Sequence, residues 1–299
     1  MTDNAKYYIP AGTTASGVYD TVITPEKVGW EWSGLKIANL RAGEETQIAT
    51  GETELLVLPL DTGASVTLDG EKYMLAGRES VFASATDYLY VPRHKSFTLR
   101  AEKAGRIALP ATKATSDKPV RYCPAGEAVT ALRGSGRSSR QVTNYALGNA
   151  VETSHLLVCE VLTPGGNWSS YPPHKHEEHG ENERELEEIY YFEVRGGRKC
   201  GCGCAEKDSG AFGLQEVYSS PKHQIDVSAR VRSGDVVAVP FGYHGPSAAA
   251  PFYDLYYLNV MGGPAEDAVW KAVDDPYHGW QRAEWEKEDV DRRLPFYTI

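Results

Sequence analysis

Short segments of β-forming residues, separated by turn residues, follow one another through most of the chain and leave no long helical stretch before residue 264. The first series comprises GLKIANL, ETQIAT, ELLVLPL, ASVTLDG, EKYMLAG, SVFASA, DYLYVP, SFTLRA and GRIALPA. The second series comprises HLLVCEVLTP, FGLQEVYS, HQIDVS, GDVVAVP and FYDLYYLNVM. Such close spacing of short apolar runs is typical of antiparallel sandwiches and barrels. The sequence therefore predicts an all-β protein with two antiparallel, jelly-roll-like barrel halves.

A polar stretch rich in glycine and serine, residues 131–149, separates the two series and marks the expected domain boundary. From residue 264 the pattern changes to one or two short helices that we expect to pack on the outside. The predicted units are an N-terminal domain over residues 1–130, a second domain over residues 131–263 and a helical tail over residues 264–299. A strand running into Val-Pro and His94 resembles the strand before His244, which favours duplication. The first half lacks a His-x-His pair, so we expect no metal site there.

The charge balance argues against partners that carry many negative charges. A formal net charge of −10 over 299 residues disfavours both nucleic acid and an anionic membrane surface as partners.

No run approaches the roughly 20 apolar residues that a membrane-spanning helix needs. The first residues, MTDNAKYYIPAG, lack the basic and apolar regions of a signal peptide, and an odd number of cysteines, five, favours reduced thiols. We therefore expect a cytoplasmic protein, and the sequence leaves open whether it forms a homo-oligomer.

Three histidines and one glutamate have the spacing of a metal site. His174 and His176 are two residues apart after a Pro-Pro pair that favours extended backbone, so both imidazoles are expected on one face of a strand. Glu188 begins the apolar strand EIYYF, and His244 follows the strand GDVVAVP. Imidazole and carboxylate together suit a single divalent transition metal, and they do not choose among Zn, Mn, Fe and Ni.

These motifs resemble a known family. His-x-His, then a glutamate, then Gly234-x5-Pro240-x-Gly242 leading into His244 is similar to the two motifs of the cupin superfamily. The segments SYPPHKH, LEEIYYF, GSGRSSRQV, PFGYHGPS, YYLNVMGGP and the Trp-rich tail resemble the 5-deoxy-glucuronate isomerase family of myo-inositol catabolism, over about residues 130–285. The resemblance implies a bicupin that isomerises an acidic sugar from aldose to ketose, 5-deoxy-D-glucuronate to 5-dehydro-2-deoxy-D-gluconate.

The resemblance also bears on the carboxylate ligand. The general cupin spacing would select Glu181, which lies inside the acidic loop HEEHGENERELEE. In the family the ligand directly precedes the aromatic strand, which favours Glu188 over Glu187. Strand alternation from Glu188 then places Tyr190 and Phe192 on the same face, inside the barrel.

The implied reaction needs a group that moves a proton and a group that binds the sugar carboxylate. The candidates for proton transfer are Tyr190, Tyr256, Asp254 and Lys175. Lys175 is the weakest of them, because alternation directs it away from the ligands. A carboxylate favours the planar fork of arginine, and the candidates around GSGRSSRQV are Arg133, Arg137 and Arg140. Taken one at a time, each arginine is more typical of a solvated or structural side chain.

Two other functions compete with isomerisation. A cupin metal site also serves dioxygenases that act on small organic acids and need Fe(II). A bicupin can also bind sugars without catalysis, because a fold alone does not specify an activity.

The cysteine-rich tract around Cys200, Cys202 and Cys204 departs from the family, where the loop is shorter and lacks cysteine. Its cysteines alternate with glycine and do not match the C-x2-C pairs of structural zinc sites. We interpret it as a hairpin tip outside the active site, of unassigned purpose.

Overall fold

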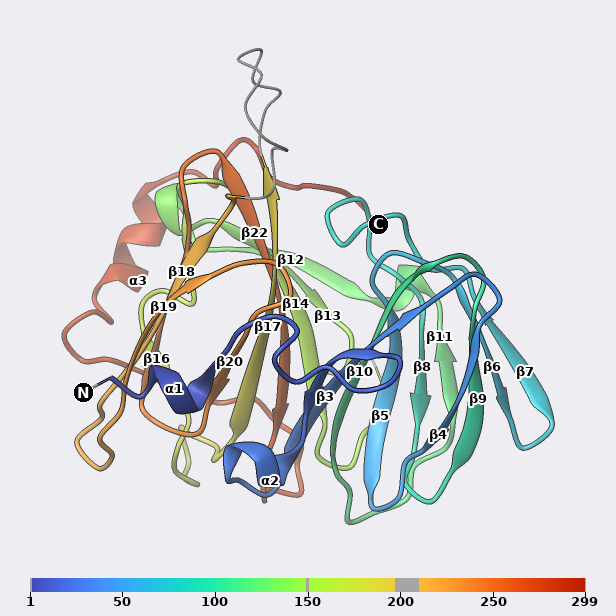
Figure 1. The fold of residues 1–299 in the computed structure, drawn as a ribbon. Helices are drawn as coiled ribbons and strands as arrows, with labels where there is room; N and C mark the ends of the chain where they lie inside the picture. The colour runs from blue at the N-terminus through green and yellow to red at the C-terminus, as the bar shows by residue number, and fades with distance from the viewer. Residues whose placement is uncertain (1, 149–150, 197–209, 299) are drawn as a thin grey trace.

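A computed structural model describes residues 2–148, 151–196 and 210–298 of the chain. Two β-barrel-like halves lie side by side, and all the strand pairings within them are antiparallel (Figure 1). The short helical elements of the described residues are α1 (Asn4–Tyr7), α2 (Pro25–Val28), η1 (Ala125–Glu127), η2 (Gly136–Ser138), α3 (Gln281–Glu284) and η3 (Trp285–Lys287). This architecture confirms the predicted all-β fold with a short C-terminal helix.

The first half consists of a six-stranded and a four-stranded sheet. The larger sheet has the order β11-β8-β5-β10-β3-β2, and the smaller one the order β4-β9-β6-β7. The strands of the larger sheet are β2 (Tyr19–Ile23), β3 (Ser33–Leu40), β5 (Thr53–Pro59), β8 (Tyr88–Val91), β10 (Gly105–Lys113) and β11 (Arg121–Cys123). Those of the smaller sheet are β4 (Glu45–Ala49), β6 (Ala64–Leu68), β7 (Glu71–Leu75) and β9 (Ser96–Ala101). Val57, Leu89 and Leu99 belong to the buried core between the two sheets.

The second half has the same two-sheet plan. Its larger sheet has the order β1-β20-β17-β22-β14-β13-β12, with β1 (Tyr8–Ile9), β12 (Val129–Arg133), β13 (Arg140–Asn144), β14 (Leu157–Thr163), β17 (Glu187–Gly196), β20 (Val236–Val239) and β22 (Tyr253–Gly262). Its other sheet has the order β19-β18-β21-β16-β23, and β15 pairs with β21. These strands are β15 (Trp168–Ser169), β16 (His174–Lys175), β18 (Gly213–Tyr218), β19 (Asp226–Val231), β21 (Tyr243–Ala249) and β23 (Val273–Asp274).

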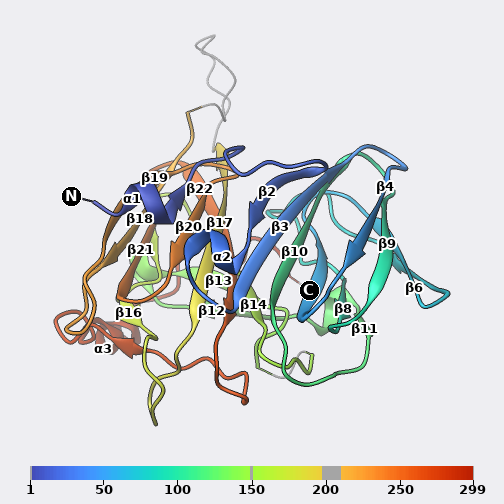
Figure 2. The ribbon, with the colours of Figure 1, turned by 60° about the horizontal axis from the view of Figure 1, so that its bottom comes forward.

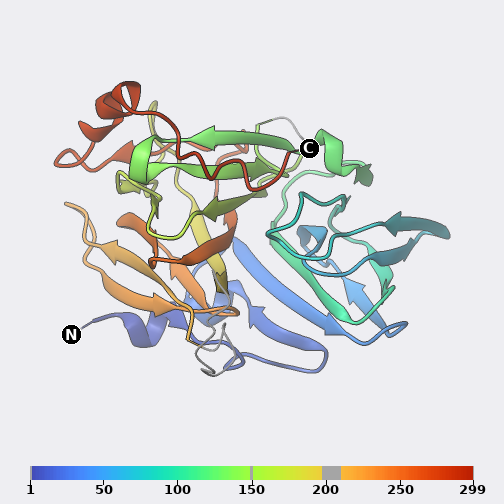
Figure 3. The same ribbon diagram turned by 90° about the horizontal axis from the view of Figure 1, so that it is seen from above.

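The two ends of the chain both attach to the second half. The N-terminal arm pairs β1 with β20, and α1 lies beside β19 (Figure 2). The C-terminal tail adds β23 to β16 and then runs along β13, where Phe296 and Tyr297 bond to Gln141 (Figure 3). The predicted boundary between residues 130 and 131 falls inside β12. The limits of the domains stay a prediction.

The larger sheets of the two halves pack against each other, with β3 and β10 next to β17 and β22. Alternate residues of β5 therefore face different neighbours: Val57 faces the core of its own half, whereas Leu56 belongs to the core shared with the second half. Because both faces of β5 are buried, its central residues 55–58 are all apolar and show no polar–apolar alternation. None of the described helices has the length and apolar character required to cross a membrane.

A buried ion pair links the halves. Arg78, from the loop after β7, pairs with Glu160 of β14, and both side chains are almost completely buried. Glu160 also accepts hydrogen bonds from Tyr145 (3.0 Å) and Tyr256 (2.7 Å). Burial opposes the charge on Arg78, but the Glu160 carboxylate outweighs it and raises the pKa of the guanidinium, so the pair stays ionised.

We expect Arg78→Met to lower the free energy of unfolding by roughly 3–5 kcal/mol, because it leaves the Glu160 carboxylate buried without a counter-charge. Chemical denaturation of the purified variants measures this. The matched control is Arg121→Met, which removes a half-exposed partner of Glu127 and should cost less than about 1 kcal/mol. Equal losses in the two variants would contradict a special role for the buried pair.

Candidate active site

The inner face of the second half brings together three of the predicted metal ligands. His176, Glu188 and His244 are all buried, and their candidate ligand atoms lie within 4.8 Å of one another. The Nε2 atoms of His176 and His244 lie 2.9 and 3.1 Å from the Oε2 atom of Glu188. His176 follows β16, Glu188 lies near the start of β17 and His244 lies on β21. Segments distant in sequence thus converge on one carboxylate.

The three histidines of the region, His174, His176 and His244, share one orientation. Each has its Nδ1 atom near a backbone carbonyl oxygen: His174 with Pro172 (3.3 Å), His176 with Leu186 (3.0 Å) and His244 with Gly242 (3.3 Å). Such a carbonyl holds the proton on Nδ1 and leaves the Nε2 lone pair available to a metal.

The Nε2 atom of His244 provides a test of whether a metal fits. It is buried and makes no hydrogen bond to the described residues, although it faces Oε2 of Glu188 at 3.1 Å. Two acceptor atoms face each other this closely in a buried site only when a cation or a proton lies between them. The donor set therefore fits a divalent transition metal.

The protonation states also suit a metal. Burial lowers the pKa of both His174 and His244, so their imidazoles are neutral. Burial disfavours the Glu188 carboxylate, but its close contacts with His176 and His244 outweigh that effect and lower the pKa of Glu188. Burial likewise opposes the charged form of His176, while the Glu188 carboxylate raises its pKa. Metal binding requires deprotonated ligands. The cluster offers an ionised carboxylate and the neutral imidazoles of His174 and His244, whereas His176 would lose its proton when it binds a metal.

His174 lies at the edge of the cluster. Its ring centroid is 4.5 Å from that of His244 and 6.3 Å from that of His176, and it also packs against Trp270. Its ligand atoms are not among those that lie within 4.8 Å of one another. Its part as a fourth ligand stays a prediction.

The other carboxylates weighed from the sequence lie elsewhere. Glu187 points to the opposite face of β17, where it accepts hydrogen bonds of 2.7 to 2.9 Å from the backbone N–H groups of residues 31–33 in the first half. Glu181 is exposed in the acidic loop. The structure therefore places Glu188, and neither alternative, beside the histidines.

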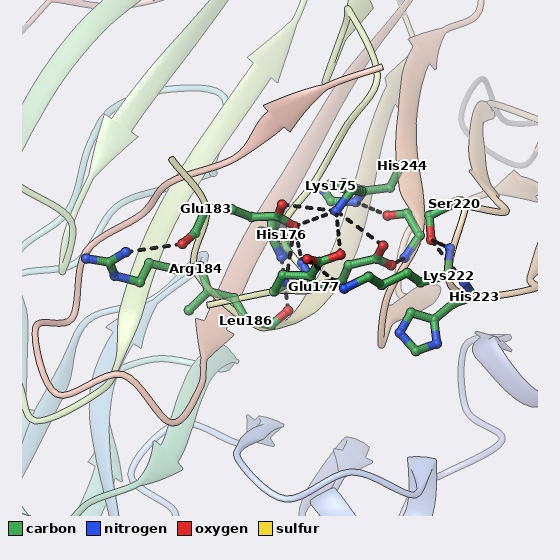
Figure 4. Close-up of polar contacts among 12 residues, drawn as sticks. Lys175, His176, Glu177, Glu183, Arg184, Leu186, Ser220, Lys222, His223 and His244 are labelled. Atoms are coloured by element: carbon green, nitrogen blue, oxygen red, sulfur yellow. Dashed lines mark hydrogen bonds and ion pairs between the residues drawn. The ribbon is translucent and has the colours of Figure 1, made fainter. Parts of the chain in front are cut away.

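Lys175 points away from the cluster, as alternation along the strand predicts. It forms ion pairs with Glu183 (2.9 Å) and Glu177 (3.3 Å) beside the two histidines (Figure 4). Glu177 in turn accepts a hydrogen bond of 2.9 Å from the backbone N–H of Gly242. This network ties the loop after His176 to the turn before His244, so Lys175 supports the site from behind and does not face it.

A cavity of about 230 Å³ opens beside the cluster, against the inner face of the larger sheet. Its lining includes Glu188 and His174 from the cluster. Its remaining lining residues are Arg133, Arg140, Val142, Asn144, Leu147, Cys159, Val161, Ser170, Tyr190, Tyr257, Asn259, Met261, Trp270, Arg282 and Trp285. A small polar molecule in this cavity would contact the metal-ligand carboxylate and several arginines at once.

Of the predicted proton-transfer residues, Tyr190 lines this cavity, with its ring centroid 6.1 Å from that of His244. Tyr256 lies on the opposite face of β22, bonded to Glu160. Asp254 forms an ion pair of 2.7 Å with Arg195, outside the cavity. Tyr257, which was not predicted from the sequence, also lines the cavity. Both faces of β22 are apolar and aromatic because both are buried, so the sequence did not show which alternate set faces the site.

The three candidate arginines separate in space. Arg140 and Arg133 line the cavity, whereas Arg137 lines a different surface hollow with Glu288 and Asp291. Arg140 donates to the carbonyl oxygens of Ser138 (3.1 Å) and Tyr171 (3.4 Å). Within the described chain, no carboxylate lies within ion-pair distance of Arg140 or Arg133. Burial, together with the neighbouring charges of Arg282 and Arg133, lowers the pKa of Arg140 to about 10.

The C-terminal tail contributes three lining residues that were not predicted from the sequence: Trp270, Arg282 and Trp285. The indole of Trp285 contacts two guanidinium groups, with its ring centroid 5.2 Å from that of Arg140 and 5.1 Å from that of Arg282. Arg282 also forms a bidentate ion pair with Asp274 of β23. The run of tryptophans in the tail was the available signal, because exposed aromatic residues at a chain end often contact a ligand or a partner.

Comparison with known proteins gives matches over most of the chain. The family model described as KduI/IolB matches residues 7–281. The chain is 36% identical over 261 residues to the 5-deoxy-glucuronate isomerase of Geobacillus kaustophilus, covering 86% of this chain and 88% of that protein. It is 33% identical over 249 residues to the 5-deoxy-glucuronate isomerase of Bacillus subtilis, covering 82% and 86%.

Solved structures give the same result for the fold. The crystal structure of an IolB-like protein from Salmonella typhimurium superposes with a TM-score of 0.82 at 32% identity, covering 92% of this chain and 99% of that one. An oxalate decarboxylase of Bacillus subtilis matches with a TM-score of 0.59 at 11% identity, covering 92% and 80%, and this likeness concerns the fold alone. Together the matches confirm the resemblance that the motifs indicated.

We expect purified protein to contain about one divalent metal ion per chain, and His176→Ala or His244→Ala to lose it while remaining folded. The reason is that each substitution removes one of the imidazoles that face Glu188. Elemental analysis measures metal content, and circular dichroism checks the fold. His179→Ala, in the neighbouring acidic loop, removes an exposed histidine and should keep the metal. Full metal content in both cluster variants would contradict the site.

Proposed function

Because the chain belongs to the KduI/IolB family, we propose that it is a metal-dependent aldose–ketose isomerase that converts 5-deoxy-D-glucuronate into 5-dehydro-2-deoxy-D-gluconate. Its curated relatives named 5-deoxy-glucuronate isomerase cover most of the chain. The observation that carries the proposal is a single cavity that joins the Glu188 carboxylate of the metal cluster to Arg140, a cation without a carboxylate partner among the described residues. An acidic sugar has the two kinds of group that such a cavity would bind.

The reaction moves one hydrogen between C2 and C1 of the sugar and develops negative charge on the oxygens of both carbons. A divalent metal held by His176, Glu188, His244 and, as predicted, His174 would supply a Lewis acid for that charge. The protein contributes a rigid arrangement of ligands on strands of two sheets, which holds the reacting carbons in one place. The buried walls of the barrel keep bulk water away from the reacting carbons.

The carboxylate end of the sugar would bind at the arginines. Arg140 is the favoured anchor, because it is partly buried and donates only to carbonyl oxygens among its described contacts. A carboxylate placed there would receive a bidentate pair of hydrogen bonds and would offset a buried positive charge. Arg133 and Arg282 lie at the more exposed side of the cavity and would add to the attraction for an anion. Trp285 packs against the guanidinium groups of both Arg140 and Arg282.

The two competing functions have weaker support. The curated relatives that cover most of the chain are named as isomerases, which favours neither a dioxygenase nor a sugar-binding protein without activity. The structural likeness to oxalate decarboxylase lies at 11% identity and therefore supports the fold without supporting that reaction.

The proposal places the activity in the cytoplasm. Cys123 and Cys159 are buried free thiols, the state that a reducing compartment preserves. Cys200, Cys202 and Cys204 lie outside the described residues, and their interpretation as a hairpin tip stays a prediction.

The decisive experiment follows 5-deoxy-D-glucuronate by NMR in the presence of purified protein of known metal content. We expect loss of the anomeric signals and appearance of a ketone, with activity lost on chelation and restored by a divalent metal. Conversion that persists after the metal has been removed would contradict the role of the cluster. Metal-containing protein that leaves the sugar unchanged, under aerobic and anaerobic conditions alike, would contradict the isomerase.

The arginine assignment predicts a difference between two substitutions in the same segment. Arg140→Gln should lower kcat/KM roughly 10- to 100-fold, mainly through KM, because a charge-assisted hydrogen bond contributes about 1.5–3 kcal/mol. Arg137→Gln is the matched comparison, because its guanidinium lines a different hollow, and we expect a change of less than about 3-fold. Steady-state kinetics on both variants measures this. A larger effect at Arg137 than at Arg140 would reverse the assignment.

A further inference from the structure

Three hydroxyl groups form a continuous chain on the wall of the cavity. The Oγ atom of Ser170 lies 3.1 Å from the phenolic oxygen of Tyr190 and 3.1 Å from that of Tyr257. All three side chains are buried, and all three line the cavity beside Glu188. Tyr190 comes from β17 and Tyr257 from β22, so Ser170 bridges two neighbouring strands from the opposite side of the barrel.

A count of protons shows what this chain can do. Each hydroxyl donates one hydrogen bond and can accept two. Two hydrogen bonds among the three hydroxyls use two of the three protons. When both hydrogen bonds run in the same direction, the third proton is left at one end, on Tyr190 or on Tyr257. Reversing the direction of both hydrogen bonds moves the free proton from one end to the other. The chain can therefore accept a proton at one tyrosine and release another at the second tyrosine.

The backbone holds the middle hydroxyl in place. Ser170 has a φ of 46°, in the left-handed region that residues other than glycine rarely adopt. Its carbonyl oxygen approaches Gly245 so closely that a Cβ atom there would lie 1.8 Å away. Gly245 follows His244, so the same turn positions a member of the metal cluster and the serine of the hydroxyl chain.

We propose that Ser170, Tyr190 and Tyr257 relay a proton between the two reacting oxygens of the sugar. The inference rests on the proposed isomerase function. In the aldose O1 is a carbonyl oxygen and O2 a hydroxyl, and in the ketose the roles are exchanged. One tyrosine takes the proton of O2 and passes its own proton to Ser170. Ser170 passes its proton to the other tyrosine, which gives its proton to O1.

The step balances. Four O–H bonds break, on O2 and on each of the three side chains, and four form, on the three side chains and on O1. The hydrogen on C2 moves to C1, so C2 is oxidised and C1 is reduced within one molecule. No other reactant is needed. After the transfer, the two hydrogen bonds among the three hydroxyl groups point in the opposite direction, and no group has changed its charge.

The relay works with neutral hydroxyl groups. Burial raises the pKa of Tyr257 to about 12, so this side chain keeps its proton at neutral pH. A neutral tyrosine is a poor base toward a carbon atom, but it exchanges protons with other oxygens readily. The three hydroxyl groups therefore move only the oxygen-bound protons. The hydrogen on C2 passes to C1 either directly or through another group.

The test compares Tyr257→Phe and Ser170→Gly with the wild-type enzyme on 5-deoxy-D-glucuronate. Each variant removes one hydroxyl, and glycine accepts the backbone conformation at position 170. We expect kcat to fall about 100-fold, with KM within about 3-fold and metal content unchanged. In mixtures of H2O and D2O, the wild-type kcat should depend on the deuterium content of the solvent in the way expected when several protons move in one step. Both variants should lose this multi-proton dependence.

Tyr256→Phe is the matched control, because it removes a buried hydroxyl from the next residue of β22 on the opposite face. We expect it to retain the wild-type kcat and the wild-type solvent isotope dependence. Wild-type kcat in Tyr257→Phe, or an effect on KM alone, would overturn the relay while leaving the isomerase intact. Failure of the wild-type enzyme to convert the sugar would overturn the proposed function itself.

Discussion

The arrangement of the second half depends on one buried carboxylate. Glu188 is ionised inside a barrel, and burying a lone charge there would cost far more than a protein can recover elsewhere. His176 and His244 approach it from other segments, their Nδ1 atoms are in turn held by backbone carbonyls, and a cation bound between them would compensate the charge. The cluster therefore ties β17 to β21 and to the loop after β16, and a metal ion bound there would strengthen the same connection.

The first half contributes support to this site without supplying any of its ligands. Its larger sheet covers the outer face of the sheet that carries Glu188, and the Arg78–Glu160 pair links the two halves on that side. Glu187, next to the cluster glutamate, binds the backbone of residues 31–33 in the first half. Adjacent glutamates thus face opposite sides of β17, one toward the metal cluster and one toward the interface between the halves.

The cavity combines two chemical environments on one sheet. Near the cluster, hydroxyl groups of Ser170, Tyr190 and Tyr257 are available for proton transfer. On another part of its wall, Arg140 and the tail provide positive charge and aromatic contacts. An acidic sugar with its carbonyl end toward the cluster and its carboxylate toward the arginines would use both environments. This division agrees with the activity named for the curated relatives.

Local spacing and period-two alternation were enough to predict the all-β architecture and to single out the His-x-His pair and the carboxylate at the start of an aromatic strand. The tertiary structure decided which residues surround the cavity. Tyr256 and Tyr257 are adjacent and equally apolar in context, and only the packing of β22 between two cores shows that Tyr257 faces the site. Likewise, only the tertiary structure shows that Arg140 lines the cavity and that Arg137 lines a different hollow. The tail residue Trp285 reaches the cavity through contacts between segments far apart in sequence. Such long-range contacts leave no periodic trace in the sequence.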